Sequence, residues 1–327
     1  MIMSSSDLTY HLHSHISSSH PQLRDSVLPS LLSSIHTIAG HLRTSPSVTQ
    51  VGTANAFGDD QLNVDVLAEE AIRKTIASCP AIVTASSEED PIEKSSPPSN
   101  EATKSKKQYT LAFDPLDGSS IIAPNWSVGT IIGIWDGPSA LHQNPDEAQI
   151  ASILGVLGPR TTAIVALRLP GSQGTCFEVG YSDDGTVEVI RKDIKLSAPP
   201  FKTRYFAPAN MRAAAESPAY LALINNFITQ KYTLRYSGGL VPDVVHALVK
   251  GHGVYVSPVT AQSKAKLRRL YELAPIALIV ECAGGMALDS ATGKRVLETS
   301  VEDTDERGGL ICGNTEEVEA VKKALLG

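Results

Sequence analysis

Eight residues at positions 113–120, Phe-Asp-Pro-Leu-Asp-Gly-Ser-Ser, constrain this chain more than any other stretch. Residues 108–113 have the composition of a strand, which leads directly into the motif. Asp114 and Asp117 are then three residues apart on a turn that a proline pre-shapes and a glycine permits. Two carboxylates this close repel each other unless a cation lies between them. The segment therefore predicts a cation site where a strand ends.

Magnesium is the cation that this segment favours, with manganese as a possible substitute, because magnesium prefers oxygen ligands and takes one or two carboxylates plus phosphate. The small residues Gly118, Ser119 and Ser120 follow at once, so that their backbone N–H groups could point at an anion. An ordinary Asp-Gly turn with a helix cap would explain Asp-x-x-Asp-Gly alone, but the full octapeptide after a strand is more specific. The stretch is interpreted as metal ligands followed by a phosphate-binding turn.

Composition excludes several functional classes. The chain has 327 residues, of which 42% are hydrophobic and 19% charged, as is ordinary for a globular protein with two cores or one large layered core. The net charge of −7 gives no indication of a nucleic-acid or anionic-membrane partner. No apolar run reaches membrane-spanning length, and the first 20 residues lack the basic and hydrophobic blocks of a targeting signal. Four scattered cysteines fit a reducing compartment, so a cytoplasmic location is expected.

Patterns along the chain predict an α/β protein with a large mixed sheet covered by helices. Residues 1–20, rich in serine and histidine, predict a mobile polar tail, and Pro199-Pro200 marks the expected boundary between domains at 21–198 and 199–327. The polar stretch 91–107 predicts a flexible surface loop. Helices are expected at 26–42, from Asp65, at 146–157, from Asn210 to Phe227, up to Lys250 and from Pro275; strands are expected at 80–85, 108–113, 127–135, 161–169, 175–181, 186–191, 204–207 and 254–256.

Seven carboxylates stand at the ends of these separate segments, where open α/β sheets place their sites. Acidic residues at a helix N-terminus often do no more than favour the helix dipole, and a strand can end in plain solvated charge. A cage of carboxylates and metal ions would instead suit phosphate-ester hydrolysis, because the ions lower the pKa of a bound water and neutralise the leaving oxygen. The seven are Asp59, Asp65, Glu88, Glu89, Asp114, Asp117 and Glu272.

The motifs resemble those of the fructose-1,6-bisphosphatase / sedoheptulose-1,7-bisphosphatase family, and the second half is most similar to sedoheptulose-1,7-bisphosphatases. The resemblance covers most of the chain and keeps the family's order of segments. It is carried by the residues at 58–65, 87–89, 112–120, 128–130, 206–212, 232–244 (Tyr-Thr-Leu-Arg-Tyr-Ser-Gly-Gly-Leu-Val-Pro-Asp-Val), 264–275 (Lys-Ala-Lys-Leu-Arg-Arg-Leu-Tyr-Glu-Leu-Ala-Pro) and 281–285.

This resemblance implies a layered αβαβα sandwich of the sugar-bisphosphatase / inositol-phosphatase type, assembled as a homodimer or homotetramer. It implies hydrolysis of the 1-phosphate of a sugar bisphosphate, with two to three Mg²⁺ or Mn²⁺ ions in each site. The implied metal ligands are Glu88, Glu89, Asp114, the Leu116 carbonyl, Asp117 and Glu272. Asp65 and Glu89 would activate the attacking water and Asp59 would assist, while the backbone of Gly118, Ser119 and Ser120 would bind the scissile phosphate. Contacts to the sugar and the distal phosphate fall to Asn210, Arg235 of a neighbouring subunit, Tyr236, Gly238, Gly239, Leu240 and Lys266.

Three departures from the family pattern affect these expectations. Ala123 stands where an acidic residue is usual. The loop 253–266 is one residue shorter than in typical fructose bisphosphatases, and Ser257 replaces their distal-phosphate tyrosine. The last two changes favour a larger distal pocket and therefore sedoheptulose-1,7-bisphosphate, with fructose-1,6-bisphosphate as the second substrate.

Three alternatives stay open at this point. One is a fructose-1,6-bisphosphatase proper. A second is a related lithium-sensitive phosphatase acting on inositol phosphate or phosphoadenosine, which would share the carboxylates but lack the segments around Arg235 and at 264–272. A third is a catalytically silent sugar-phosphate-binding protein, which would keep Asn210 and Lys266 but lose metal ligands.

Overall fold

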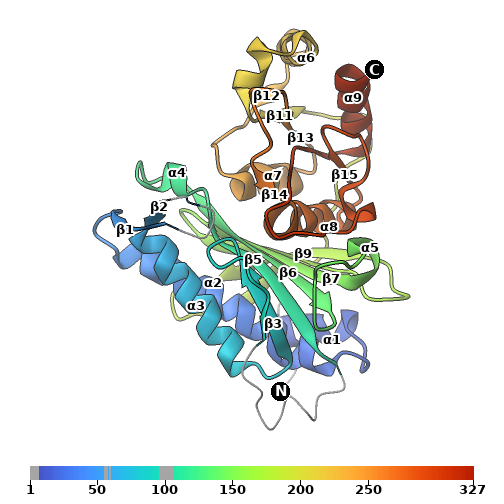
Figure 1. The fold of residues 1–327 in the computed structure, drawn as a ribbon. Helices are drawn as coiled ribbons and strands as arrows, with labels where there is room; N and C mark the ends of the chain where they lie inside the picture. Colours follow the sequence, from blue (N-terminus) through green and yellow to red (C-terminus); the bar gives the residue numbers. More distant parts are fainter. Residues whose placement is uncertain (1–6, 55–57, 59, 96–106) are drawn as a thin grey trace.

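An eight-stranded mixed sheet forms the core of the N-terminal half in the computed structural model, which describes residues 7–54, 58, 60–95 and 107–327 (Figure 1). The strand order is β10-β9-β8-β7-β6-β5-β3-β4. Strands β3 and β5 are parallel and all the other neighbours are antiparallel. The strands are β3 (Ile82–Ser87), β4 (Lys94–Ser95), β5 (Tyr109–Asp117), β6 (Val128–Asp136), β7 (Gln149–Leu157), β8 (Thr161–Leu167), β9 (Thr175–Tyr181) and β10 (Val187–Arg191).

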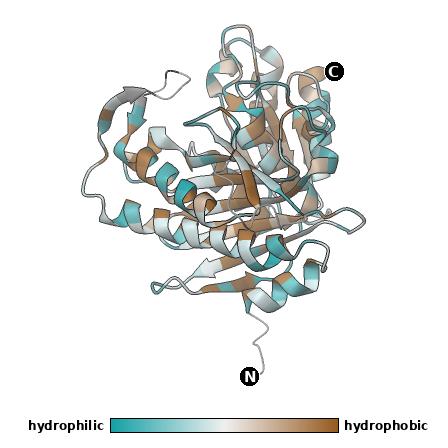
Figure 2. Cartoon of the chain, turned by 60° about the horizontal axis from the view of Figure 1, so that its bottom comes forward, coloured by the Kyte–Doolittle hydropathy of each residue, from teal (hydrophilic) through white to brown (hydrophobic). Residues whose placement is uncertain are grey.

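Three helices cover one face of this sheet: α1 (Leu8–His15), α2 (Leu28–Thr44) and α3 (Asn63–Ser78). A π-helical turn at Leu23–Val27 leads into α2, and a small two-stranded sheet of β1 (Gln50–Ala54) and β2 (Asp60–Leu62) precedes α3. The apolar residues of α2 recur at helical spacing and are fully buried, as at Leu28, Leu31, Leu32, Ile35 and Ile38. Figure 2 shows this division, with hydrophobic residues in the interior and hydrophilic residues on the outer surfaces of the helices.

The opposite face of the sheet is covered by α7 (Leu240–Lys250) and α8 (Ala274–Cys282), which also pack against a second sheet. That five-stranded sheet has the order β12-β11-β13-β17-β15, and α6 (Pro218–Thr229) and α9 (Thr315–Leu326) cover its outer face. Its strands are β11 (Tyr205–Pro208), β12 (Thr233–Leu234), β13 (Val254–Ser257), β15 (Met286–Asp289) and β17 (Leu310–Gly313). The five layers therefore follow the αβαβα order that the resemblance predicted, while the division into domains near residue 199 stays a prediction.

Shorter elements connect these layers. They are α4 (Ser119–Ile122), α5 (Pro145–Ala148), the 3₁₀ turns Met211–Ala215 and Val296–Glu298, the π-helical turn Arg269–Leu273, and the paired strands β14 (Leu267–Arg268) and β16 (Arg307–Gly308). Within the described ranges, no helix combines the length and the apolar character needed to cross a membrane.

Helix α7 lies unusually close to the large sheet at one position. An added Cβ on Gly129 of β6 would lie 2.3 Å from the Cβ of Val241, so only glycine permits this approach. The contact fixes the N-terminal turn of α7 against the strand that pairs with β5. The helix is thereby placed beside the end of β5, where the sequence predicted the cation site.

The helix predicted at 146–157 is wrong. The structure has only the short helix α5 and then strand β7 over Gln149–Leu157, which is buried on both faces. A continuous apolar run suits a strand in the middle of a covered sheet as well as a core helix, and periodicity does not separate the two. In the second half, the single helix expected from Asn210 is interrupted because the Ser217 side chain caps a new helix that begins at Pro218.

The mobile tail predicted for residues 1–20 is also wrong over the described residues 7–20. The carboxylate of Asp7 accepts hydrogen bonds from the backbone of Thr9 and Tyr10 and so caps α1. Leu12 and Ile16 are each 1% exposed and belong to the core under the large sheet. Two well-spaced apolar residues dock this helix despite its polar composition. Most of the loop predicted at 91–107 lies outside the described residues.

The docked helix leads to a stability prediction. We expect Leu12→Ala to lower the free energy of unfolding by about 2–5 kcal/mol, because it removes a buried side chain from a packed core. Tyr10→Ala on the same helix is the control, because Tyr10 is 57% exposed, and it should change stability by about 0.5 kcal/mol or less. Urea denaturation of the two variants measures the difference. Equal stabilities would mean that α1 is not docked in solution.

Candidate active site

Three buried carboxylates from two distant segments meet beside the large sheet. Asp114 and Asp117 lie at the end of β5, and Glu272 lies in the π-helical turn before α8. One oxygen from each lies within 4.8 Å of the others. Burial, together with the charges of neighbouring carboxylates, raises the pKa of Asp114 and of Glu272 well above their usual values and the pKa of Asp117 to about 7. In their ionised form these three carboxylates would repel one another, and a bound cation would offset that repulsion.

A β-bulge explains why two residues three apart reach the same site. The partners of Asp114 and Asp117 on β6, Ile131 and Gly129, are only two apart, so β5 carries one extra residue. In a regular strand, side chains three apart point to opposite faces, and the bulge reverses this. The bulge is held by a 2.9 Å hydrogen bond from the Thr130 hydroxyl to the Pro115 carbonyl.

Asp117 also joins the cluster to α7. Its two oxygens accept hydrogen bonds from the backbone N–H groups of Leu240 (3.2 Å) and Val241 (2.7 Å). These groups belong to the first turn of the helix, where N–H groups lack partners within the helix and the dipole favours a negative charge. These two hydrogen bonds therefore hold the Asp117 carboxylate in its position within the cluster.

The glycine turn before α7 lies directly against the predicted phosphate-binding turn. Added Cβ atoms on Gly238 and Gly239 would lie 3.3 and 3.2 Å from the side chain of Ile121. Gly118 has a φ of 98°, a left-handed conformation that favours glycine. The structure thus brings the predicted sugar-contacting residues at 238–240 next to the turn at 118–120, where Ser119 and Ser120 are exposed.

Glu88 and Glu89 lie at the border of the three-carboxylate cluster. They follow β3, and the Glu88 N–H donates to the Phe113 carbonyl at 3.0 Å. The charge of Glu88 contributes to the raised pKa values in the cluster, and its carboxylate is hydrogen-bonded by Arg268. Burial raises the pKa of Glu89 to about 7, although its hydrogen bond from Gln61 acts in the opposite direction.

Asp65 lies at the start of α3 and is 3% exposed. It accepts a hydrogen bond from the Leu62 N–H at 2.9 Å, and its other oxygen lies 3.1 Å from the Ser119 hydroxyl. That hydroxyl is also 3.1 Å from the carbonyl of Leu116. Burial raises the pKa of Asp65. Asp65 is therefore tied to the predicted phosphate turn, whereas Asp59 lies outside the described residues.

The residues predicted to hold the distal phosphate are less tightly assembled. Arg235 and Tyr236 are exposed and line a cleft of about 1040 Å³, together with Trp126. Asn210 has a φ of 51° and donates from its side chain to the Pro258 carbonyl at 2.8 Å. Lys266 is exposed. Among the described residues, its side chain makes no hydrogen bond to Asn210 or to Tyr236.

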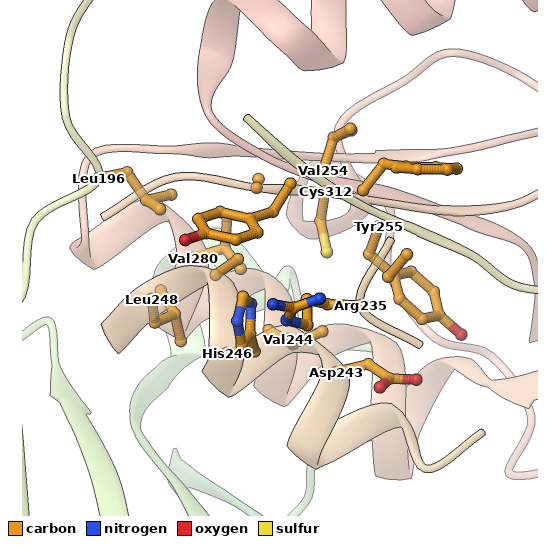
Figure 3. Close-up of a pocket in the computed structure, with 16 residues that line it drawn as sticks. Leu196, Arg235, Asp243, Val244, His246, Leu248, Val254, Tyr255, Val280 and Cys312 are labelled. Carbon is orange, nitrogen blue, oxygen red and sulfur yellow. The ribbon is translucent and has the colours of Figure 1, made fainter. Parts of the chain in front are cut away.

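A narrow recess behind α7 lies beside this cleft. Figure 3 shows Arg235 and His246 on one side of it and the apolar residues Leu196, Val254 and Val280 around the remainder. Its free volume of about 10 Å³ holds no more than one water molecule. The recess is therefore not a substrate site, and the cleft that contains Tyr236 is the larger opening near the cluster.

Two residues at the site were not singled out from the sequence. Arg268 is 3% exposed and pairs with Glu88, and its backbone N–H donates to the Glu272 carboxylate. Asp243 accepts hydrogen bonds from the backbone of Ser237 (2.6 Å) and Gly238 (3.1 Å) and so shapes the glycine turn. Both occur in segments that carried the family resemblance, but their roles depend on burial, which those segments did not reveal.

The donor set fits a hard divalent cation. The atoms that converge are carboxylate oxygens, they are buried, and the burial leaves their charge uncompensated. Mg²⁺ and Mn²⁺ prefer such ligands, whereas zinc and copper sites in proteins usually include histidine or cysteine. The arrangement can therefore bind a divalent metal beside a turn that is suited to phosphate.

Comparisons with known proteins agree with this geometry. The profile of the fructose-1-6-bisphosphatase N-terminal domain matches residues 12–181, and that of the C-terminal domain matches residues 200–326. The chloroplastic sedoheptulose-1,7-bisphosphatase of Chlamydomonas reinhardtii is 36% identical over 94% of this chain and 74% of its own length. A class 1 fructose-1,6-bisphosphatase of Syntrophotalea carbinolica is 33% identical over 84% of this chain and 80% of its own length.

Solved structures show the same fold. A crystal structure from Toxoplasma gondii, whose name of sedoheptulose-1,7-bisphosphatase is provisional, has a TM-score of 0.87 at 34% identity and covers 99% of both chains. The holo form of Leishmania major fructose-1,6-bisphosphatase has a TM-score of 0.84 at 24% identity over 98% of this chain and 99% of its own. At that identity the second likeness speaks for the fold alone.

The raised pKa values lead to a prediction about pH. Folded metal-free protein holds protons on Glu89 and Asp117 up to about pH 7, whereas an unfolded chain releases them at its ordinary carboxyl values. These groups therefore stabilise the metal-free fold at low pH and lose that contribution as the pH rises toward 7. We expect the unfolding temperature with chelator to fall over this range, and Mg²⁺ to restore most stability at the upper end.

Glu89→Gln and Asp117→Asn are the matched variants for this experiment, because neither new side chain titrates. Thermal unfolding at several pH values, with chelator and with Mg²⁺, should give a flatter pH dependence for both variants than for the unaltered chain. An identical pH dependence in all three proteins would contradict the raised pKa values.

Proposed function

The chain belongs to the fructose-1,6-bisphosphatase family of sugar bisphosphatases, which are phosphoric monoester hydrolases, and on that premise we propose Mg²⁺-dependent removal of the 1-phosphate of sedoheptulose-1,7-bisphosphate. Fructose-1,6-bisphosphate is the second substrate. The observation that carries the proposal is the buried group of Asp114, Asp117 and Glu272 beside the turn at 118–120. A silent sugar-phosphate-binding protein would have no use for such a costly cluster.

The metal ligands in this proposal are Asp114, Asp117, Glu272, Glu88, Glu89 and the Leu116 carbonyl, which together suit two or three Mg²⁺ ions, with Mn²⁺ as a possible substitute. Bound divalent metal supplies Lewis-acid polarisation of the phosphoryl group and acidifies water. Asp117 contributes through its fixed position, since α7 holds it by two backbone hydrogen bonds. Glu88 supplies a further ligand from the turn after β3, and Arg268 offsets part of its negative charge.

Asp65 together with Glu89 activates the attacking water, whose proton passes to one of these two carboxylates. In the metal-free protein burial raises the pKa of both carboxyls, that of Glu89 to about 7, so each is a stronger proton acceptor than an ordinary exposed carboxylate. Asp65 is the better placed of the two relative to phosphate, because it lies 3.1 Å from the hydroxyl of Ser119. Asp59 assists them in this proposal.

The backbone of Gly118, Ser119 and Ser120 binds the scissile phosphate. These residues open α4, and N–H groups at the start of a helix have no partner within it. Arg268 adds a buried positive charge next to Glu88 and Glu272. Its guanidinium is suited to pair with phosphate oxygens when substrate is present.

The distal end of the substrate meets Asn210, Tyr236, Lys266 and the backbone at 238–240. Arg235 of a neighbouring subunit completes this set, which requires a homodimer or homotetramer. The exposure of Arg235, whose guanidinium lies 5.8 Å from the Tyr205 ring at the edge of the cleft, supports a role across a subunit boundary. A cytoplasmic location is part of the same proposal.

The seven-carbon substrate is proposed because of the distal pocket. Ser257 stands at the end of β13 where typical fructose bisphosphatases have a tyrosine, and it is only partly buried. The similarity to sedoheptulose-1,7-bisphosphatases of plants and algae supports the same choice. A fructose-1,6-bisphosphatase proper is the second candidate, favoured by the similarity to the bacterial class 1 enzymes.

We expect hydrolysis to require a divalent metal and the carboxylates that hold it. Glu89→Gln and Asp117→Ala should each reduce kcat by about 10²-fold or more, because each removes a group that acts in the transition state. Glu70→Gln is the control, because Glu70 lies exposed on α3. Phosphate release from sugar bisphosphates, with Mg²⁺ and with chelator, measures these effects. Undiminished turnover in the presence of chelator would contradict the proposal.

The choice of substrate is tested separately. We expect both bisphosphates to be hydrolysed, with a higher kcat/KM for sedoheptulose-1,7-bisphosphate, because a missing carbon changes discrimination by only about 1–3 kcal/mol. Ser257→Tyr should lower kcat/KM for the longer sugar more than for the shorter one. Kinetics on the two substrates under the same conditions decide the matter, and a clear preference for fructose-1,6-bisphosphate would favour the second candidate.

A further inference from the structure

The turn that carries Glu88 and Glu89 is closed at both ends by its own flanking residues. Ser87 and Asp90 enclose the two glutamates, and the Ser87 N–H donates to the Asp90 carbonyl at 3.0 Å. In return, the Asp90 N–H donates to the Ser87 hydroxyl, also at 3.0 Å. Ser87 is completely buried. The Ser87 hydroxyl therefore helps to fix the position of this turn.

A pair of charged residues on α3 holds that hydroxyl. One oxygen of Glu69 accepts hydrogen bonds from the Arg73 guanidinium at 2.7 Å and from the Ser87 hydroxyl at 2.9 Å. The guanidinium of Arg73 lies 3.4 Å from the same hydroxyl and 3.6 Å from the Asp90 carboxylate. Glu69 and Arg73 are one helical turn apart, so both reach the turn from a single helix face.

Arg73 also contacts the strand that carries the cluster. Its guanidinium carbon lies 5.3 Å from the centre of the Phe113 ring, within cation–π range. The Phe113 carbonyl accepts the hydrogen bond from the Glu88 N–H, and Asp114 is the next residue. The α3 pair therefore braces the Glu88–Glu89 turn and the end of β5 against each other.

Stability gives little reason for this pair. The side chain of Glu69 is only 16% exposed, burial raises its pKa, and its second oxygen has no hydrogen-bond partner among the described residues. The side chain of Arg73 is 27% exposed, so the pair is only partly buried, and neither exposed nor buried ion pairs as a rule add much net stability. What the pair does provide is a fixed position for the turn.

We propose that Glu69 and Arg73 are positioning residues that hold Glu88 and Glu89 in the geometry needed to bind a divalent cation together with Asp114 and Asp117. The inference rests on the proposed function, since it concerns the same site. Neither residue touches the cation or the substrate in this role. Residues that orient metal ligands typically change metal affinity by about 10- to 100-fold when they are replaced.

The test measures the affinity of the full, substrate-free chain for Mn²⁺ by electron paramagnetic resonance. The double variant Glu69→Leu/Arg73→Met should bind Mn²⁺ about tenfold more weakly or worse, with an unfolding temperature equal to or above that of the unaltered chain. Glu69→Gln should bind within about twofold of the unaltered chain, because its amide oxygen still accepts from Ser87 and Arg73. Ser87→Ala, which keeps the ion pair but removes the hydroxyl, should also weaken binding and serves if the double variant does not fold.

Glu70→Leu/Lys74→Met is the matched control, because it replaces two charged residues with the same spacing on the exposed side of α3. Unchanged Mn²⁺ affinity in the double variant, or in Ser87→Ala, would overturn the inference. The inference would also be overturned if the control bound Mn²⁺ as weakly as the double variant, or if the double variant had a lower unfolding temperature than the unaltered chain. Phosphate release by the unaltered chain is measured in the same preparations: its absence would contradict the proposed function, whereas the Mn²⁺ affinities test the positioning role.

Discussion

The repulsion among Asp114, Asp117 and Glu272 is the constraint on which the arrangement of this protein depends. Three buried carboxylates with oxygens within 4.8 Å of one another are unfavourable for a fold unless a cation compensates their charge or protons neutralise it. The chain assembles them by separate local devices, which are a bulge in β5, a π-helical turn before α8 and the first turn of α7. The bulge brings Asp114 and Asp117 to one site, the first turn of α7 holds Asp117, and the π-helical turn carries Glu272.

Helix α7 connects this cluster to the remainder of the site. Its first turn holds Asp117, the glycines before it lie against the turn at 118–120, and its body packs against both sheets. The close approach at Gly129 fixes the helix relative to β6. The proposed cation site, the proposed phosphate-binding turn and the segment proposed to contact the sugar are consequently joined through one helix, and α3 supports the opposite side through Asp65, Glu69 and Arg73.

The family resemblance of the motifs predicted the layers of the fold. The proximity of Asp114 to Asp117 could be predicted from the motif itself, because a strand, a turn and an acidic pair are encoded locally. Their roles in catalysis stay predictions. The strand at 149–157 was mistaken for a helix because a strand buried on both faces lacks alternation, and α1 was missed because two docked side chains outweigh a polar composition. The roles of Arg268 and of the Glu69–Arg73 pair depend on burial and on contacts between distant segments, which no local pattern carries.

The central claim is that a divalent cation compensates the buried carboxylates. A crystal of this protein grown with Mn²⁺ tests it most directly through the anomalous scattering of manganese. The account predicts at least one anomalous peak, from a manganese ion that lies about 2.1–2.3 Å from oxygens of Asp114, Asp117 and Glu272. A map without a peak at these carboxylates, at a Mn²⁺ concentration that supports turnover, would contradict it.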